Sequence, residues 1–126
     1  MLTDDPQSHT IEFQNPVFHD GINVTVRNGD KWARKLKLGD HLMPTRTGET
    51  PPYDSQNRVI GIYYCSLDEL PATVLRQEHD PKCRTKSGLA AELDSVYGPT
   101  RFGHRMVTVI VWIRETRFGG GPWGSD

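Results

Sequence analysis

An alternation of apolar and polar residues over 22–27 is the strongest constraint on how this chain folds. A period of two is typical of a strand that is buried on one face. The two sides of the predicted strand are Ile22, Val24 and Val26 against Asn23, Thr25 and Arg27. The pattern therefore predicts a strand whose polar row, Thr25 and Arg27, projects onto an open face.

The remaining apolar patterns predict four more strands and two helices. Strands are expected at 10–14, from residue 41, at 58–65 and at 106–114. A helical turn at 30–36 would begin at Asp30, and helices are expected at about 71–79, with Pro71 at the first helical position, and at about 87–97. No strand–helix repeat is present, which argues against a parallel sheet. The predicted fold is α+β and mostly β: a small mixed β-barrel of five or six strands with two helices inserted before the last strand.

The length of 126 residues suits one domain. We expect a disordered lead-in at 1–9, a domain at 10–115 and a flexible, glycine-rich tail at 116–126. Residues 44–57 are rich in Pro, Thr, Gly and Asp and form a long polar loop without periodicity. Such a loop inside a small domain is either functional or disordered.

Charge and composition exclude several classes of protein. The formal net charge is −1, so nucleic-acid binding would need a local basic patch. The polar N-terminus is no signal peptide and no apolar run approaches about 20 residues, so we expect a cytoplasmic protein without a membrane span. The histidines share no ligand spacing, and neither Cys65 nor Cys83 has a second Cys or a His at zinc spacing, so no metal or cofactor is expected.

Thr25 and Arg27 are the first candidate ligand-binding residues. They project together from one strand, and the guanidinium fork of arginine suits phosphate or carboxylate groups. The alternative is a solvated strand edge on which Arg27 pairs with Asp30 or with a glutamate.

The segment that follows this strand is basic and aromatic. Lysines around Trp32 could attract a phosphate backbone while the indole stacks on a base. Alternatively, Trp32 lies in the core and the basic residues form a solvated turn. Tyr63 is another possible stacking residue. The candidates in this group are Lys31, Trp32, Lys35, Lys37 and Tyr63.

Glu78 and His79 are adjacent near the end of the first predicted helix. A carboxyl group beside an imidazole could act as a general acid and base. Alternatively, the pair is an ordinary polar helix terminus, with His79 at the negative end of the helix dipole.

Four features in this order resemble the ASCH domains of the PUA-like superfamily, over about residues 10–115. They are Val24-Thr25-Val26-Arg27, Leu36-Lys37-Leu38-Gly39-Asp40, Ser66-Leu67-Asp68-Glu69-Leu70 before a helix, and Val96-Tyr97-Gly98 before a final strand. The resemblance implies a five- or six-stranded barrel with a cleft between sheet and helices. It also implies recognition of RNA or modified nucleosides. Some members cleave RNA, and some small ones hydrolyse the amide of N4-acetylcytidine.

The family's cleft signature is Gly-x-Lys-x-x-Glu-x-Arg, with Thr replacing Glu in the small amidohydrolases. With Arg27 as its Arg, Thr25 takes the Glu/Thr position, Ile22 the Lys position and Asp20 the Gly position. Glu78 falls near the helix carboxylate that the amidohydrolases use. The missing lysine favours a binding cleft over an active enzyme.

The sequence thus predicts binding of RNA or of a modified nucleoside or nucleotide in a cleft bordered by Thr25, Arg27, Lys31 and Glu78. Two alternatives stay open. The first is a small hydrolase, an N4-acetylcytidine amidohydrolase or a ribonuclease, in which Thr25 and Glu78 are catalytic. The second is a protein-interaction module that uses loop 44–57.

Overall fold

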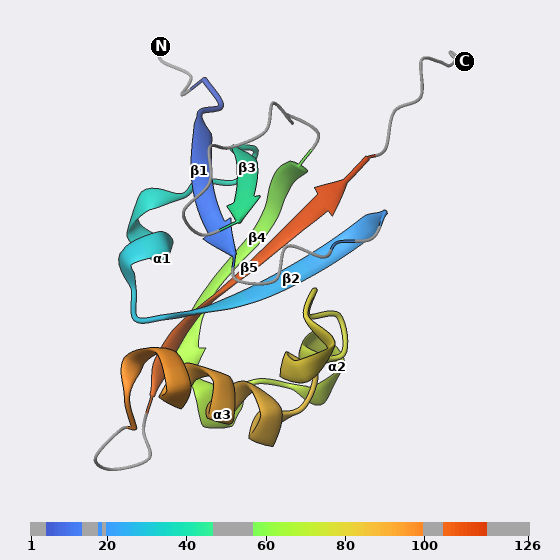
Figure 1. Ribbon diagram of the computed structural model, residues 1–126. Coiled ribbons are helices and arrows are strands. Elements are labelled where there is room, and N and C mark those ends of the chain that lie inside the picture. The colour runs from blue at the N-terminus through green and yellow to red at the C-terminus, as the bar shows by residue number, and fades with distance from the viewer. Residues whose placement is uncertain (1–4, 14–17, 19, 47–56, 100–104, 116–126) are drawn as a thin grey trace.

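The computed structural model describes residues 5–13, 18, 20–46, 57–99 and 105–115, which form one mixed five-stranded sheet with helices beside it (Figure 1). The strand order is β1-β3-β4-β5-β2, with β1 parallel to β3 and the other pairs antiparallel. The predicted α+β class, mostly strand and mixed, is confirmed. The strands are β1 (Ser8–Phe13), β2 (Gly21–Asn28), β3 (His41–Arg46), β4 (Asn57–Ser66) and β5 (Met106–Arg114).

The helices predicted before the last strand are confirmed in place. A short α1 (Lys31–Lys35) joins β2 to β3, and the β4–β5 connection holds four short elements: η1 (Leu67–Glu69), α2 (Ala72–Leu75), η2 (Pro81–Cys83) and α3 (Lys86–Tyr97). Thr85 caps α3 by accepting a hydrogen bond from the Gly88 N–H, and Gly98 ends it with a positive φ of 84°. Asp30 precedes α1 but makes no side-chain cap hydrogen bond.

The prediction of one helix over 71–79 was wrong, because the helix ends at Leu75. Residues 77–79 instead pair with β2. The Val24 N–H donates to the Gln77 carbonyl at 3.2 Å, and the His79 N–H donates to the Val24 carbonyl at 2.8 Å. The Gln77 and Glu78 N–H groups still donate to carbonyls three residues back, but the Gln77 carbonyl and the His79 N–H bond to β2, so Glu78 lies in a bridge beside this strand rather than on a helix.

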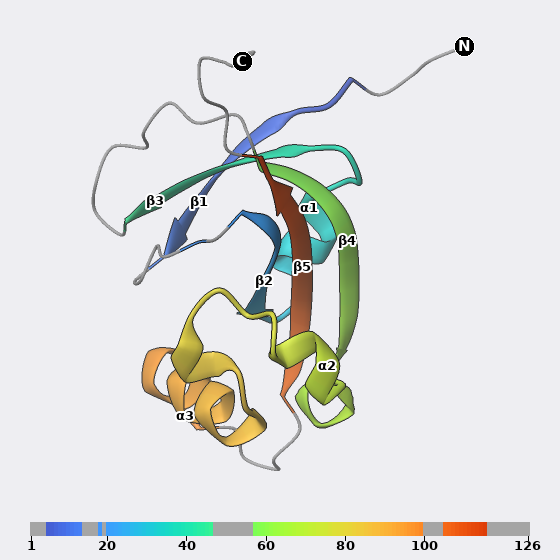
Figure 2. The same ribbon diagram turned by 90° about the vertical axis from the view of Figure 1, so that its right-hand side faces the viewer.

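The predicted closed barrel was also wrong. Within the described residues the two end strands, β1 and β2, are not paired with each other. The sheet therefore curls but does not close (Figures 1 and 2). The physical reason lies at the outer edge of β2. Its Val24 backbone groups are bonded to residues 77–79, and its Val26 N–H donates to the Glu78 carboxyl, so these groups are not available to β1.

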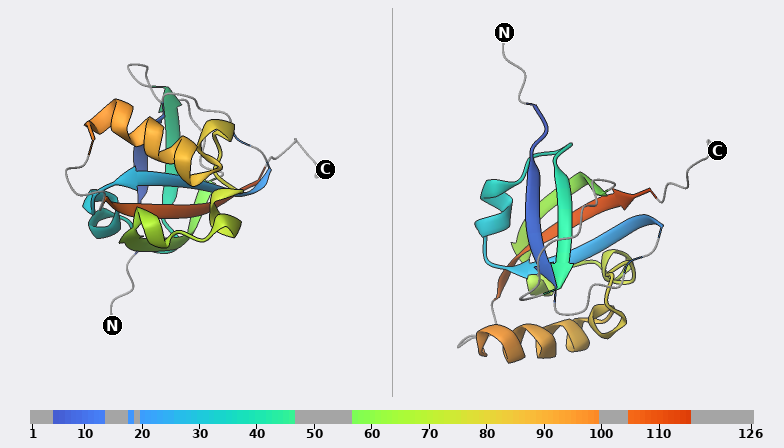
Figure 3. Two further views of the ribbon diagram at one scale, coloured as in Figure 1. Left: turned by 90° about the horizontal axis from the view of Figure 1, so that it is seen from below. Right: turned by 45° about the horizontal axis from the view of Figure 1, so that its top comes forward.

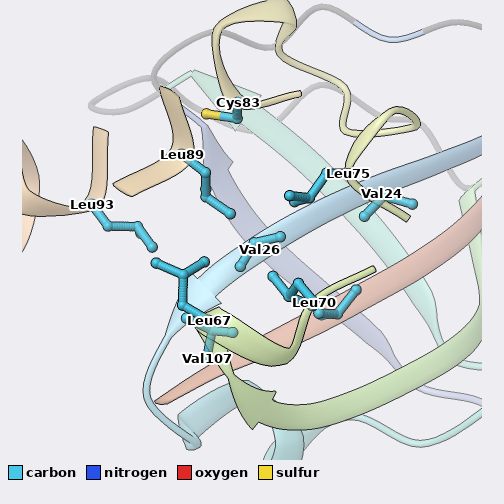
Figure 4. Packing of buried hydrophobic residues seen from close by; sticks show 10 residues of the cluster. Val24, Val26, Leu67, Leu70, Leu75, Cys83, Leu89, Leu93 and Val107 are labelled. Carbon is cyan, nitrogen blue, oxygen red and sulfur yellow. The ribbon is translucent and has the colours of Figure 1, made fainter. Parts of the chain in front are cut away.

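Two apolar clusters lie on the two faces of the curled sheet. The first joins the sheet to the β4–β5 connection, as Figure 4 shows, with Val26, Leu75 and Leu89 among its residues. The second fills the inside of the curl around Trp112 and Phe13. Residues from β5 reach both clusters, Val107 and Val109 the first and Ile110 and Trp112 the second, because successive side chains of a strand point to opposite faces.

A buried arginine holds the end of α3 against the sheet. Arg105 donates to the Asn28 side-chain oxygen at 2.5 Å, to the Asp94 carboxylate at 2.9 Å and to the Gly98 carbonyl. In the view from below, α3 lies next to β2 (Figure 3, left). These contacts position the helix that covers the site described next.

The first strand begins two residues earlier than the predicted residue 10, inside the predicted lead-in at 1–9, of which residues 5–9 are described. β1 begins at Ser8, and the His9 imidazole contacts the Asp40 carboxylate at 2.8 Å. Asp40 also accepts hydrogen bonds from the Gln7 and Lys37 N–H groups, and these contacts outweigh the raising effect of burial and keep the pKa of its carboxyl below the ordinary value.

Two predicted segments fall outside the described residues. Loop 44–57 overlaps the ends of β3 and β4, and its residues 47–56 are not described; neither is the tail 116–126. Among the helices that the structure describes, none is long and apolar enough to span a membrane.

Candidate functional site

A pocket of about 260 Å³ lies at the seam where the sheet fails to close. One wall comes from the end of β1, and another comes from β2. The segment 78–83 and α3 provide the rest. Its lining residues are Glu12, Phe13, Thr25, Val26, Arg27, Glu78, His79, Asp80, Cys83, Leu89, Glu92, Leu93, Val96 and Tyr97. The structure thus brings together the three residues Thr25, Arg27 and Glu78.

Glu78 is the most deeply buried carboxyl group in this lining, with 2% of its surface exposed. Its Oε2 accepts from the Val26 N–H at 3.0 Å and its Oε1 accepts from the Asp80 N–H at 2.9 Å. Burial raises the pKa of Glu78 to about 8, although these two hydrogen bonds and the charge of Arg27 act in the opposite direction. The carboxyl group is therefore neutral over much of the physiological range and able to donate a proton in a hydrogen bond.

Arg27 reaches across the seam from β2 to β1. Its Cζ lies 4.5 Å from the centre of the Phe13 ring, a cation–π contact between the two edge strands. Burial lowers the pKa of Arg27, and Tyr97, Glu78 and Glu12 partly offset this effect. The guanidinium remains a cation, because arginine is not deprotonated in proteins.

The open face predicted for strand β2 is covered. Thr25 is 3% exposed, because β1, α3 and the segment 78–83 enclose this part of the strand. Of the two partners that the alternative offers for Arg27, Asp30 or a glutamate, the nearby charges are those of the glutamates Glu78 and Glu12. Asp30 contacts Arg34 at 3.4 Å, one turn further along α1.

His79 packs among aromatic rings. Its imidazole centre lies 4.7 Å from that of Phe13, at an angle of 83°, and 5.3 Å from that of Phe18. Its Nε2 lies 3.4 Å from Oε1 of Glu78. The predicted placement of His79 at a helix dipole is wrong, because the helix ends four residues earlier.

The basic and aromatic residues of α1 do not line this pocket. Trp32 is half-buried and packs against the inner apolar cluster. The Lys31 and Lys35 ammonium groups lie 5.9 and 4.8 Å from the centre of its ring. Lys37 lies beyond the helix, where its N–H donates to Asp40. A contact of these residues with nucleic acid stays a prediction, separate from the pocket.

Tyr63 is likewise outside the pocket. It is 58% exposed on β4 and lines a different groove, beside α2. The cleft bordered by Thr25, Arg27, Lys31 and Glu78 is therefore brought together without its lysine, and Tyr63 belongs to another surface.

Sequence reasoning missed the residues that complete the pocket. Phe13 and Glu12 come from the end of β1, while Asp80, Glu92 and Tyr97 come from the β4–β5 connection. No local pattern marks them, because they approach Arg27 only when the sheet curls and α3 packs beside β2.

The charge of the lining is mainly acidic. Among the described residues that line the pocket, Arg27 is the only Lys or Arg, against the carboxyl groups of Glu12, Asp80 and Glu92 and the largely protonated Glu78. No group of three His, Cys, Asp or Glu side chains in the described part of the chain is arranged to hold a metal ion.

Fold and site together define a small α+β protein with a curled, open sheet and a partly acidic pocket at the seam. Comparison with protein-family models, with curated proteins and with solved structures finds no match to this chain. The resemblance to ASCH domains stays an expectation from sequence, and the pocket itself provides the basis for a function.

Proposed function

We propose that the pocket binds a single uncharged nucleobase, either in a free nucleoside or in RNA. The observation that supports this function is the convergence of Thr25, Arg27 and Glu78 on one small pocket. These residues supply a hydroxyl group, a cationic donor and a carboxyl group, which are the groups that read the hydrogen-bonding edge of a base.

The volume of the pocket favours a small ligand with a single ring system, such as one base. Pockets for small ligands usually range from about 300 to 1,000 Å³, and this one, at about 260 Å³, lies just below that range. A base fits such a space, whereas an oligonucleotide would have to remain largely outside it.

The charge of the lining argues against phosphate inside the pocket. A phosphate group would meet one arginine and a set of carboxyl groups, and like charges that are close together in a desolvated site repel strongly. Of the two partners that the sequence suggests for Arg27, phosphate or a base carbonyl, the carbonyl is therefore the better one.

Hydrogen bonding favours a base that has an amino group beside a ring nitrogen. A protonated Glu78 can donate to the ring nitrogen and accept from the amino group, which is the edge that cytosine and adenine present. Cytosine adds a carbonyl oxygen that Arg27 can bind. We therefore expect cytidine, or a derivative of it, to bind more tightly than uridine.

Replacing Arg27 by methionine is expected to weaken cytidine binding by about tenfold or more, because hydrogen bonds to a charged group contribute roughly 1.5–3 kcal/mol. Methionine keeps the aliphatic stem beside Phe13, so the fold should persist. Isothermal titration with cytidine, uridine, adenosine and guanosine measures the effect. Arg34→Met, on exposed α1, is the matched control and should bind like the parent. Equal affinities of the parent and Arg27→Met would contradict the proposal.

A hydrolase is the second candidate. Thr25 and Glu78 share the pocket, and a carboxyl group with a pKa of about 8 is suited to proton transfer near neutral pH. Against this reading, Ile22 occupies the position of the family lysine and pairs with Ile113 on β5. Lys31, the nearest substitute along the chain, lies beside Trp32.

We expect N4-acetylcytidine to bind without rapid conversion to cytidine and acetate. Chromatography of a prolonged incubation tests this for the parent protein, Thr25→Ala and Glu78→Gln, and labelled RNA tests the ribonuclease alternative in the same way. Turnover by the parent that both substitutions remove would establish the hydrolase instead of the binding protein.

A further inference from the structure

A second hollow lies beside the candidate pocket. This groove of about 720 Å³ runs between the sheet and the η1–α2 region, and none of its described lining residues carries a formal charge. The residues are Val24, Ile62, Tyr63, Tyr64, Cys65, Leu70, Pro71, Thr73, Val74, Gln77, Val109 and Val111. The groove therefore suits an uncharged, flat or apolar group.

The connection from α2 to α3, residues 76–84, separates the groove from the pocket. We call this segment the arch; Figure 2 shows it between the two helices, beside β2. Gln77 lines the groove and Glu78 lines the pocket. Val24 of β2 lines the groove and Thr25 lines the pocket, so adjacent residues of both segments belong to different hollows.

The arch presents positive charge to solvent. Arg76 and Lys82 are exposed, and Arg84 is half-buried, with its Nε donating to the Glu78 carbonyl at 2.8 Å. The carboxyl groups of Glu78 and Asp80 turn inward, where they accept backbone hydrogen bonds. The arch is thus a basic ridge between the uncharged groove and the acidic pocket.

Tyr63 offers an aromatic surface in the groove. An added Cβ on Gly61 would lie 3.1 Å from Cε2 of Tyr63, so the ring extends over Gly61, two residues away on β4. The ring thus lies against the strand at Gly61, and the side chain remains 58% exposed. An exposed aromatic ring that is supported in this way can stack on a base of any type.

We propose that single-stranded RNA crosses the arch, with one base in the pocket, the phosphates on Arg76, Lys82 and Arg84, and a neighbouring base stacked on Tyr63. This inference rests on the proposed function of the pocket and extends it from a nucleoside to a strand. It assigns backbone attraction to the arch rather than to Lys31, Lys35 and Lys37 of the α1 region.

The test compares fluorescein-labelled hexacytidylate RNA, measured by anisotropy, with free cytidine, measured by calorimetry. The variants are the double substitution Arg76→Gln/Lys82→Gln and the single substitution Tyr63→Leu, with Lys35→Gln as the matched control on α1. Thermal unfolding of each variant verifies that it is folded.

The double variant is expected to bind hexacytidylate about tenfold more weakly at low salt, and the dependence of log K on log salt should flatten by about 0.7 for each lost phosphate contact. Tyr63→Leu should cost about fivefold or more. Cytidine affinity should remain that of the parent in all variants, and Lys35→Gln should bind both ligands like the parent.

Hexacytidylate binding that depends on Lys35 and not on the arch would overturn the inference, as would equal affinities of the parent for hexacytidylate and cytidine. Arch-dependent binding of hexacytidylate without any cytidine binding would instead overturn the proposed pocket while supporting the basic ridge. The two failures are therefore distinguishable.

Discussion

The free energy of unfolding is expected to fall by several kcal/mol as pH rises from about 4.5 to about 8, and Glu78→Gln should remove most of this dependence. The physical origin is the raised pKa of Glu78, from an ordinary 4.5 to about 8 in the folded protein. Because one pKa unit corresponds to about 1.4 kcal/mol, the full range is equivalent to at most about 5 kcal/mol.

The sign follows from proton binding. Below pH 4.5 the Glu78 carboxyl is protonated in both states, so no charge is buried on folding. Between 4.5 and about 8 the folded state holds the proton and the unfolded state releases it, so each rise in pH favours unfolding. Above about 8 both states are ionised, and the cost of burying the charge is fully present.

Glutamine resembles the neutral carboxyl group but cannot copy all of its contacts. Its amide nitrogen would face the N–H of either Val26 or Asp80, at a cost of about 1–3 kcal/mol that does not vary with pH. Glu78→Gln should therefore be less stable than the parent in mild acid and should approach or exceed it at pH 8.

Urea denaturation of both proteins from pH 4.5 to 8.5 measures the two slopes. Glu92→Gln, which changes a half-buried glutamate of the same pocket, is the control and should follow the parent. Parallel curves for the parent and Glu78→Gln would show that folding does not raise the pKa of Glu78.

Replacing Gly88 by alanine is expected to lower the free energy of unfolding by more than about 3 kcal/mol, as steric overlap in a packed region does. A Cβ at this position would lie 2.1 Å from the Lys82 carbonyl oxygen and 3.0 Å from Oγ1 of Thr85. The first of these atoms is backbone of η2, so relief requires α3 and η2 to separate.

This result would reverse the effect expected from helix propensity, by which alanine is favoured over glycine inside a helix by about 1 kcal/mol. Ser87→Ala, one residue earlier on the exposed side of α3, is the matched control and should change stability by less than about 1 kcal/mol. Thermal and urea unfolding measure both variants. A Gly88→Ala protein as stable as the parent would mean that α3 and η2 are less closely packed than described.

The Gly88 contact also bears on the site. Cys83 of η2 and Leu89 of α3 both line the pocket, so separating the two elements would widen it. Any Gly88→Ala protein that folds should therefore bind cytidine more weakly than the parent.

Local patterns were sufficient for most of the secondary structure. The alternation at 22–27 and the apolar run at 106–114 became β2 and β5, which pair antiparallel along their length. The helix predicted at 87–97 became α3. These elements depend on side-chain periodicity, which the chain carries within a few residues.

Local patterns were insufficient where backbone groups form hydrogen bonds with residues far away in the sequence. Residues 77–79 look like the continuation of a helix, yet Gln77 and His79 bond to the backbone of Val24, more than fifty residues earlier. These hydrogen bonds end α2 early, occupy the outer edge of β2 and leave the sheet open. They also carry Glu78 into the seam.

For the candidate site, the sequence by itself determined which side chains were available and that Thr25 and Arg27 would share one row of a strand. Only the tertiary structure decided that this row is buried, that Glu78 faces it and that α1 lies apart from it. The physical reason is that the charge and proton affinity of a side chain depend on the neighbours that exclude water from it. For Glu78 and Arg27 those neighbours come from β1, from β2 and from the β4–β5 connection.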